Sequence, residues 1–518
     1  MSGDDRAARV SRRGLLQATT AGAVLAGAGV AFAGNGPPPP TYAGGGRRVA
    51  LSGDPVLHVL RRVTFGPTAE LVAHVRKIGV DAFLDEQLAP SELPDAEVER
   101  ILALFPTLRM SNTALRQAYA DRRAVVVQEL QAASLVRAVW STHQLYEVMV
   151  EFWSNHFSIH VQHEDALLFK TGDDRDVIRA HALGRFADLL VASAQSPAML
   201  AYLHNWLSSG TNPNEDYGRE LLELHTLGVS GGYTERDVKQ VALCLTGWDV
   251  DRTTWQFGYR PERHYVGPLR VMGWRAANGD AAKGVETGLS LLDYLAHHPS
   301  TARHIARRLC VRFVSDSPPA SLVESAARVY LASDTQIVPV LRHIFASQAF
   351  RTSAGLKFRR PFELMTASLR AIGARYDVAA GSDVANDLIH LLKGLGHPPF
   401  GWQTPDGYPD TASAWLSTQA LLNRWNMQQH IVVRGVRGLS GPRPDKLAAT
   451  PGAGTTVGAL VDEVCGRVAF QGVAGAHRAA LIASTRRKER APLTGAEAAA
   501  LTPQLTALVL SSPYLQLR

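Results

Sequence analysis

Hydrophobic residues recur at steps of three and four along most of the chain, which is the spacing of amphipathic α-helices. Strand-like alternation is sparse, and we find no internal repeat at the periods of about 20–50 residues that mark repeat folds. The sequence therefore predicts a mainly α fold: a large multi-helix domain with long ordered loops and little β structure. The clearest predicted helices lie at 188–194, 220–224, 291–309, 361–372 and 418–432.

Polar residues mark where one further helix begins. Thr234 can cap this helix, with Asp237 as the third-position acid of a capping box. An apolar face that includes Val238 and Val241 follows, and we expect Gly247 to end the helix. Two stretches without a helical pattern, 249–283 and 396–410, carry aromatic residues and histidines among their glycines. They are typical of ordered loops that form sites.

The first 33 residues have the three parts of a secretory signal: a charged start, an apolar middle and a small-residue exit at 31–33. Arg12 and Arg13 assign it to the twin-arginine pathway. A membrane helix is the alternative, but the apolar run is shorter than the about 20 residues that a span needs, and no later segment qualifies. We therefore predict an exported protein that is periplasmic, surface-bound or secreted, without a transmembrane segment after cleavage.

These features divide the chain into three parts. Residues 1–33 are the expected signal peptide, and residues 34–50, rich in proline and glycine, are a linker. Residues 51–518 are expected to form a single large helical domain, with a flexible insertion at about 437–456.

Composition excludes two classes of protein. The formal net charge of +7 is dispersed, so we expect no nucleic-acid partner. The three cysteines, Cys244, Cys310 and Cys465, are widely spaced and form no CxxC motif, so a disulfide scaffold is excluded and burial as small apolar residues is expected.

The common catalytic signatures HExxH, GxGxxG, GxSxG and the Walker loop are absent. Two polar segments remain as candidates. His156 and His160 are four residues apart, so a helix would place them on one face. In the second segment, Glu220 and Glu223 share a face one turn apart, and His225 follows in the last turn before a glycine. We expect one polar cleft whose catalytic residues are Glu220, Glu223, His225 and His156.

A divalent metal is the cofactor that this set could hold, with His156, His225 and Glu220 as its ligands. Each residue also has a purely structural interpretation. Glu220 can pair with a neighbouring arginine, His225 can complement a helix dipole, and His160 can be incidental. The joint occurrence of histidines and carboxylates beside Trp and Phe favours the shared cleft.

Aromatic residues and polar groups near these segments and in the two loops complete the candidate site. Such mixtures are typical of clefts that bind carbohydrate or another polar polymer, although core packing explains isolated tryptophans equally well. The expected substrate-binding residues are Trp153, Asn155, Arg219, Tyr217, His264, Asp410, Trp415 and Arg424.

Several motifs carry a resemblance to a known family. They include the segments RRVTFGP, FWSNHF, RPFE, GYPD and LLNRWN and a long central block at 214–248. With these motifs the sequence resembles the bacterial DUF1800 family, a domain of unknown function, over nearly the whole chain after the signal. The resemblance implies a largely helical, often exported protein, commonly encoded beside an alkaline-phosphatase-like exported partner.

The chain departs from the family pattern at two places. His264 is followed by Tyr265 where members commonly have His-Asp, and His160 lies outside the family motif. Both departures weaken a metal site built from His160 or from the His264 loop. They leave the His156, Glu220, Glu223 and His225 set as the firmer candidate.

Two functions fit these observations. The first is an exported hydrolase or lyase that acts on an extracellular or cell-wall polymer through the His/Glu cleft, with or without a metal. The second is a non-catalytic assembly or surface-binding protein that works with the co-exported alkaline-phosphatase-like partner. The enzyme predicts that the four residues converge on an open cleft, whereas the second function predicts that they are sealed and satisfied by Arg219 and backbone groups.

Overall fold

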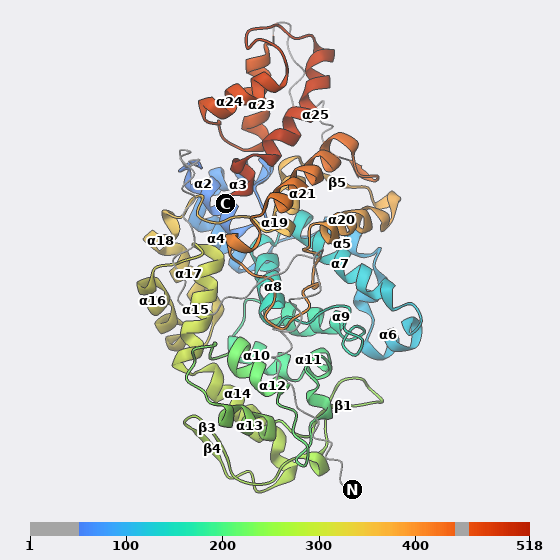
Figure 1. Ribbon diagram of the computed structural model, residues 1–518, viewed down its shortest axis with the longest axis vertical. Coiled ribbons are helices and arrows are strands. Elements are labelled where there is room, and N and C mark those ends of the chain that lie inside the picture. Colours follow the sequence, from blue (N-terminus) through green and yellow to red (C-terminus); the bar gives the residue numbers. More distant parts are fainter. Residues whose placement is uncertain (1–50, 441–454) are drawn as a thin grey trace, which may run out of the picture. The chain divides into compact units, whose positions relative to one another are not determined.

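Helices dominate the computed structural model, which describes residues 51–440 and 455–518 (Figure 1). In these ranges the strands form only two-stranded antiparallel pairs. The expected mainly α fold is thus confirmed. The predicted signal peptide, the linker and most of the predicted insertion lie outside the described residues.

Consecutive helices pack against one another through the first half of the chain. Most are short, with loops that include 3₁₀ turns between them. The first helices are α2 (Pro55–Val63), α3 (Ala69–Ile78), α4 (Val80–Leu88), α5 (Ala96–Leu102), α6 (Asn112–Tyr119), α7 (Arg123–Trp140) and α8 (Gln144–His156). They are followed by α9 (Lys170–Gly172), α10 (Phe186–Ala194), α11 (Pro197–Tyr202), α12 (Asp216–Glu220) and α13 (Glu235–Cys244).

The second half contains two packed groups of helices. α15, α16 and α17 lie side by side, and α25 packs against both α21 and α23 (Figure 1). The helices are α14 (Gly284–Ala296), α15 (Pro299–Phe313), α16 (Ala320–Ala332), α17 (Ile337–Ala346), α18 (Gln348–Arg351), α19 (Pro361–Ala371), α20 (Asp383–Gly394), α21 (Thr418–Gln429), α23 (Val457–Val468), α24 (Gly475–Ser484), α25 (Gly495–Ser511) and α26 (Pro513–Gln516).

Local sequence signals set several helix ends. Thr234 and Asp237 form the expected capping box at the start of α13, since each side chain bonds to the other residue's backbone N–H. The single helix expected at 291–309 is wrong: the chain breaks after Ala296, and α15 begins at Pro299. A proline disfavours helical geometry in the residue before it, and His298 is accordingly extended.

The strands lie mainly in the predicted non-helical stretch at 249–283. Each pair is a short antiparallel ladder, for example with Trp248 opposite Tyr259 and Leu269 opposite Ala276. The stretch is therefore an ordered pair of hairpins. The strands are β1 (Trp248–Val250), β2 (Phe257–Tyr259), β3 (Leu269–Val271), β4 (Trp274–Ala276), β5 (Arg375–Tyr376) and β6 (Leu439–Ser440).

Three stretches are wound as π-helix, which is rare and often found near functional sites. They span Asp173–Arg179, Leu221–His225 and His430–Arg434. The second replaces the regular helix expected at 220–224, and the third continues α21.

Helix α8 is deeply buried and carries several polar residues. It packs on α2, α4 and α7 (Figure 1). Its buried residues include Glu147, Ser154, Asn155 and His156 as well as apolar side chains. A buried helix with this many polar groups needs internal partners for them, and these partners form the site described below.

The described residues belong to one compact unit. None of the helices in this part of the chain is long and apolar enough to cross a membrane.

Candidate functional site

The structure brings His156 and His225 together in the core. Both side chains are fully buried, the ring centroids lie 6.1 Å apart, and Nε2 of His156 lies 3.0 Å from the backbone oxygen of His225. His304 of α15 completes the cluster, with its ring centroid 6.0 Å from that of His156. Burial lowers the pKa of His225 to about 3 and that of His304 to about 4. These imidazoles are therefore neutral at physiological pH.

His160 does not share a helix face with His156. Helix α8 ends at His156, so the expected four-residue pairing on one helix is wrong. The neighbouring Phe157 turns out of the helix with φ −98° and ψ 57°. His160 lies partly buried in the segment beyond.

Glu220 and Glu223 are more exposed than His156 and His225. Glu223 accepts a hydrogen bond from the Tyr233 hydroxyl at 3.1 Å, and Glu220 is partly buried. Arg219 is bound to Glu235 through two hydrogen bonds of 2.8 and 2.6 Å. Both of these hydrogen bonds thus run to the first residue of α13, which is not a member of the His156, Glu220, Glu223 and His225 set.

No metal site is formed in the ranges that the structure describes. No group of three or more His, Cys, Asp or Glu residues there has the arrangement to hold an ion. The expected ligand set of His156, His225 and Glu220 is not such a group. The geometry therefore gives no support to metal ligation by these residues.

Of the other expected binding residues, Trp153 and Arg424 have internal partners, whereas the buried Tyr217 hydroxyl has no hydrogen-bond partner in the described structure. Trp153 donates from Nε1 to the Ala182 oxygen at 2.9 Å, and Tyr217 is buried. Arg424 donates to the Arg359 oxygen and to Gln516 Oε1.

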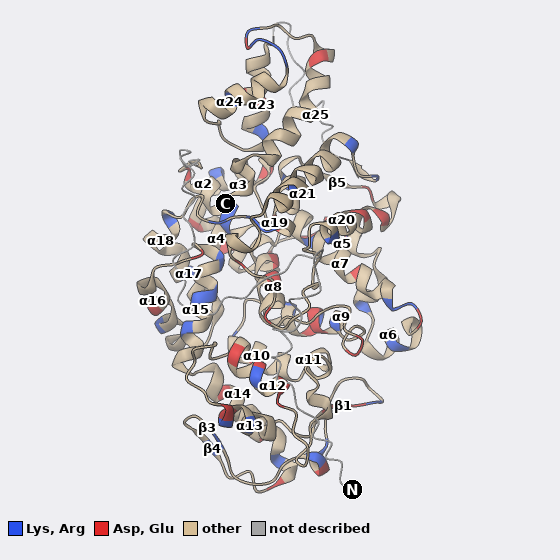
Figure 2. Cartoon of the chain, viewed as in Figure 1, with Lys and Arg blue, Asp and Glu red and all other residues tan. Residues whose placement is uncertain are grey.

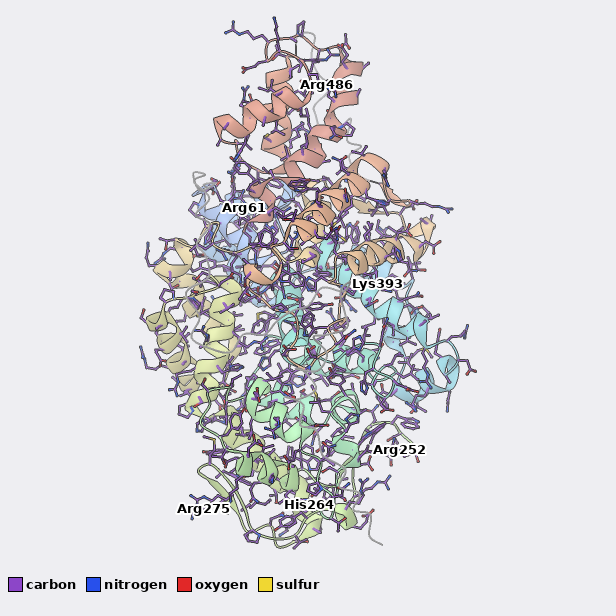
Figure 3. The ribbon with its side chains drawn as sticks, viewed as in Figure 1. Arg61, Arg252, His264, Arg275, Lys393 and Arg486 are labelled. Carbon is purple, nitrogen blue, oxygen red and sulfur yellow. The ribbon has the colours of Figure 1, made fainter. Side chains whose placement is uncertain are left out.

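The His264 ring connects two parts of the loop region through its two nitrogens. Its Nδ1 lies 2.9 Å from the Thr246 oxygen, and its Nε2 lies 3.0 Å from Oδ1 of Asn278. Figure 3 shows His264 among the hairpins, well separated from α8 in Figure 1. The candidate site therefore does not include the His264 loop.

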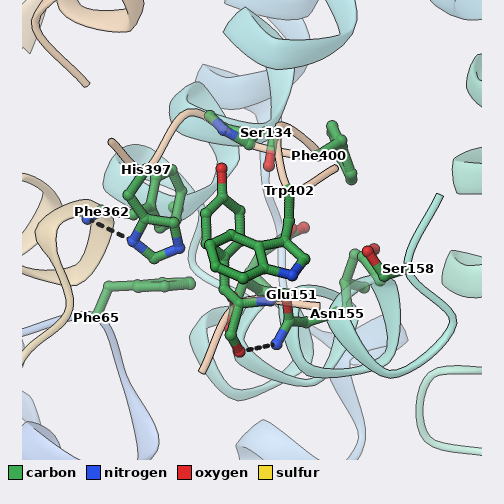
Figure 4. A pocket seen from close by; sticks show the side chains of 15 residues that line it. Phe65, Ser134, Glu151, Asn155, Ser158, Phe362, His397, Phe400 and Trp402 are labelled. Carbon is green, nitrogen blue, oxygen red and sulfur yellow. Dashed lines mark hydrogen bonds between the residues drawn. The ribbon is translucent and has the colours of Figure 1, made fainter. Parts of the chain in front are cut away.

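One face of α8 lines a cavity. Glu147, Glu151 and Asn155 follow at four-residue steps, so they lie on the same helix face. We call this space the α8 cavity; α7, α19 and the 397–408 segment provide its other walls (Figure 4). The remaining lining residues are mostly aromatic or small: Phe65, Ser134, Ala138, Val150, Ser154, Ser158, Phe362, His397, Pro399, Phe400, Trp402 and Tyr408.

Asn155 holds the 397–408 segment against α8. Its Nδ2 donates to the Tyr408 oxygen and its Oδ1 accepts from the Tyr408 N–H, both at 2.7 Å. Gly407 makes this approach possible. Its φ is +74°, and a Cβ there would lie 2.1 Å from the Asn155 backbone oxygen. The glycine of the GYPD motif is thus required by both its conformation and its closeness to α8.

The wall behind Glu151 is a buried network of charges. Arg360 donates to Glu151 at 2.7 Å and to Glu363 at 3.0 Å, and Arg312 binds the same Glu363 oxygen. Arg518 lies 3.4 Å from that oxygen. The three guanidinium groups hold the pKa of Glu363 well below its usual range. This network joins α8, α15 and α19.

Asp410 belongs to the same network. Nζ of Lys357 lies 3.1 Å from Oδ1 of Asp410 and 2.7 Å from Oδ1 of Asp316. Lys357 and the nearby arginines lower the pKa of Asp410. The aromatic neighbour Trp415 donates to the Pro409 oxygen at 2.9 Å and stacks on His397.

Glu147 has a separate set of partners. Arg179 binds it through two hydrogen bonds of 2.9 Å and also reaches Asp174 at 2.8 Å. Burial works against the Arg179 cation, but the two carboxylates outweigh it and raise its pKa well above the usual value. Both acidic residues on the cavity face of α8 are therefore paired with arginines.

A second cavity lies on the other side of Glu151, Asn155 and Tyr408. We call it the α15 cavity, because five of its lining residues belong to that helix. Figure 2 shows basic residues along α15. The cavity is lined by Glu151, Phe152, Asn155, His304, Arg307, Arg308, Val311, Arg312, Arg360, Asp406, Tyr408, Pro409, Asp410 and Thr411.

Among the expected site residues, Asn155 and Asp410 line these cavities; the rest lie elsewhere. Sequence reasoning missed Glu151, Glu363 and the arginines of α15. One feature of the sequence does indicate the α15 residues. His304, Arg308 and Arg312 are spaced by four, which puts a histidine and two arginines on one helix face.

The comparisons with known proteins agree with this account of the chain. The model of the family described as "Protein of unknown function (DUF1800)" matches residues 58–517. No curated protein and no solved structure matches the chain. The matched range contains every lining residue of both cavities. The chain therefore belongs to the DUF1800 family.

Proposed function

We propose that this protein is exported and acts as a hydrolase or lyase on an extracellular or cell-wall polymer that binds at Glu151, where the α8 cavity meets its neighbouring cavity. The observation that carries the proposal is the cavity wall, in which aromatic rings such as Trp402 and Phe362 surround the carboxylate of Glu151. Ligand pockets typically combine apolar and aromatic walls with a few fixed polar groups. The Ser154 hydroxyl, which is buried without a hydrogen-bond partner in the described structure, is one further group that a ligand would satisfy.

We assign the proton-accepting role to Glu151 in place of the His156 and Glu220 set. Its side chain is 17% exposed and lines both cavities. Arg360 and Arg312 lie 2.7 and 3.5 Å from its Oε2, so two cations hold the carboxylate in place.

The charged groups around Glu151 favour a lyase reaction over hydrolysis. Acid-assisted hydrolysis of glycosides uses a carboxylic acid with a raised pKa. Glu363 and Asp410 both have lowered pKa values and are carboxylates at neutral pH. Elimination starts instead when a base removes a proton from carbon. The C–O bond of the leaving group then breaks, a carbon–carbon double bond forms, and the leaving oxygen takes up a proton.

A non-catalytic assembly or surface-binding protein is the second candidate. The sealed pair of His156 and His225 favours it, because buried polar groups of this kind fix helix geometry and do not contact a substrate. A co-exported alkaline-phosphatase-like protein would then be its partner.

The test uses protein purified from the periplasm or medium and a panel of neutral and anionic extracellular polysaccharides and peptidoglycan. New reducing ends report any cleavage, and ultraviolet absorbance of a new double bond identifies elimination. We expect Glu151→Gln to lose about 100-fold or more of the activity, the usual contribution of a general base. Glu324→Gln, at an exposed position of α16, is the matched control and should keep full activity. If the unaltered protein cleaves nothing in the panel, the enzyme proposal fails and the assembly protein is favoured.

A further inference from the structure

The α15 cavity has an unusual excess of arginine. It encloses about 280 Å³ and is lined by four arginines, Arg307, Arg308, Arg312 and Arg360, against three carboxylates. His304 adds a neutral imidazole. Three of the arginines and the histidine come from one face of α15, because they recur at steps of three and four residues.

Two of the three carboxylates in this wall are already paired with cations. Glu151 is held by Arg360 at 2.7 Å, and Asp410 is held by Lys357 at 3.1 Å. Asp406 is exposed and accepts from Nε1 of Trp402 at 2.8 Å. None of the three therefore serves as a close counter-ion for Arg308.

Arg308 has no ion pair and no hydrogen bond to any residue of the described ranges. Its Cζ lies 5.9 Å from the centroid of the Phe152 ring. Burial lowers the pKa of Arg308 to about 10, which still leaves a cation at neutral pH. Asp410 and Asp406 act on this cation through space and partly offset the effect of burial.

The neighbouring arginines also carry N–H groups that have no hydrogen-bond partner within the described structure. Arg312 and Arg360 are almost fully buried, yet Nε and Nη2 of Arg312 and Nε of Arg360 have no hydrogen-bond partner within the described structure. Guanidinium groups offer planar sets of N–H donors that match the oxygens of carboxylates and sulfates. An anionic group in the α15 cavity would pair with Arg308 and face these donors.

We propose that the α15 cavity binds an anionic substituent, a carboxylate or a sulfate, of a unit of the polymer that contacts Glu151. The two cavities adjoin, since Glu151, Asn155 and Tyr408 line both. This inference rests on the proposed function and names its substrate class, an anionic polysaccharide. It also supplies what elimination beside a carboxylate needs, because a cation near that group stabilises the negative charge that develops when the proton leaves.

The experiment is a calorimetric titration at constant ionic strength with three monosaccharides that differ in one substituent: glucose, glucuronate and glucose 6-sulfate. We expect saturable binding of at least one anionic sugar, and binding of glucose that is weaker by about tenfold or more, as one charge-assisted hydrogen bond would give. Arg308→Gln should weaken binding of that anionic sugar about tenfold and leave glucose unchanged. Arg303→Gln is the matched control, since Arg303 lies exposed on the same helix and outside the cavity.

The outcomes separate this inference from the proposed function. Equal binding of glucose and both anionic sugars, or equal loss in the Arg308→Gln and Arg303→Gln variants, would overturn the anion site even if a neutral polymer is cleaved. Selective anionic binding without cleavage of any polymer would uphold the site and reject the enzyme. Preference between glucuronate and glucose 6-sulfate identifies which substituent the cavity takes.

Discussion

His225 shows how far burial changes the chemistry of a single residue. Its ring is fully buried, and neither ring nitrogen has a hydrogen-bond partner in the described structure. Desolvation is therefore the main cause of its low pKa, followed by the positive charge of Arg308. A histidine in an unfolded chain has a pKa of about 6.5. This difference links the protein's stability to pH.

The sign of the linkage follows from proton uptake. Below about pH 6.5 the unfolded chain binds a proton at His225 that the native protein does not bind, so the free energy of unfolding falls as pH falls, by up to about 1.4 kcal/mol per unit for one histidine. We predict that His225→Gln reduces this dependence between pH 6 and pH 4. Urea unfolding at several pH values measures it, with exposed His74→Gln as the control. The prediction fails if the variant and the unaltered protein lose stability equally steeply.

At the scale of elements, one carboxylate joins three helices. Glu363 of α19 contacts Arg312 of α15, and Arg360, at the start of α19, extends the network to Glu151 of α8. Removing one partner from a buried ionic network leaves unpaired charge, which is more costly than losing the pair as a whole. The helix packing around both cavities therefore depends on this side chain.

We predict that Glu363→Gln destabilises the protein by about 3–5 kcal/mol, as removal of one partner of a buried pair typically does. The arginines lower the pKa of Glu363, so its contribution is present above the unfolded pKa of about 4.3 and is lost as pH falls below it. Chemical unfolding at pH 7 measures the loss, and Glu324→Gln on exposed α16 is the control. A variant as stable as the unaltered protein at pH 7 would contradict the structural importance of the network.

Local sequence predicted elements well where the signal lay within one or two turns. The capping box at Thr234 and the start of α19 at Pro361 are both observed. The π-helical turn at Leu221–His225 is not predicted from the sequence, because the spacing of apolar residues does not distinguish a short π-helical turn from a regular α-helical one. The prediction that His156 and His160 share a helix face likewise assumes a continuous helix, whereas α8 ends at His156.

At the scale of the whole molecule, the two cavities are assembled from distant parts of the chain. Phe65, Glu151, Phe362 and Trp402 all line the α8 cavity, although more than 300 positions separate the first from the last. The family match over residues 58–517 contains all of them. The cavity therefore requires the folded domain as a unit, and no separate segment of it would form the site.

The predicted export by the twin-arginine pathway belongs to the same scale, because that pathway carries folded proteins. We predict that replacing Arg12 and Arg13 together by lysine retains the protein in the cytoplasm. Cell fractionation and immunoblotting measure its distribution. The unaltered chain should appear in the periplasm or medium as a shorter species. Unchanged export of the doubly substituted chain would contradict the twin-arginine assignment.

The sequence by itself determined the helical class, the local caps and the family motifs, because these depend on periodicity and short-range chemistry. It also predicts export from the cytoplasm. Asn155 and Asp410, which the sequence predicts as substrate-binding residues, line the cavities, and their contact with a substrate stays a prediction. Only the tertiary structure decided that His156 and His225 are sealed in the core while Glu151 and Arg308 line the cavities. The physical reason is that spacing fixes which residues share a helix face, whereas packing between distant helices decides what covers that face and which charges are left without a partner.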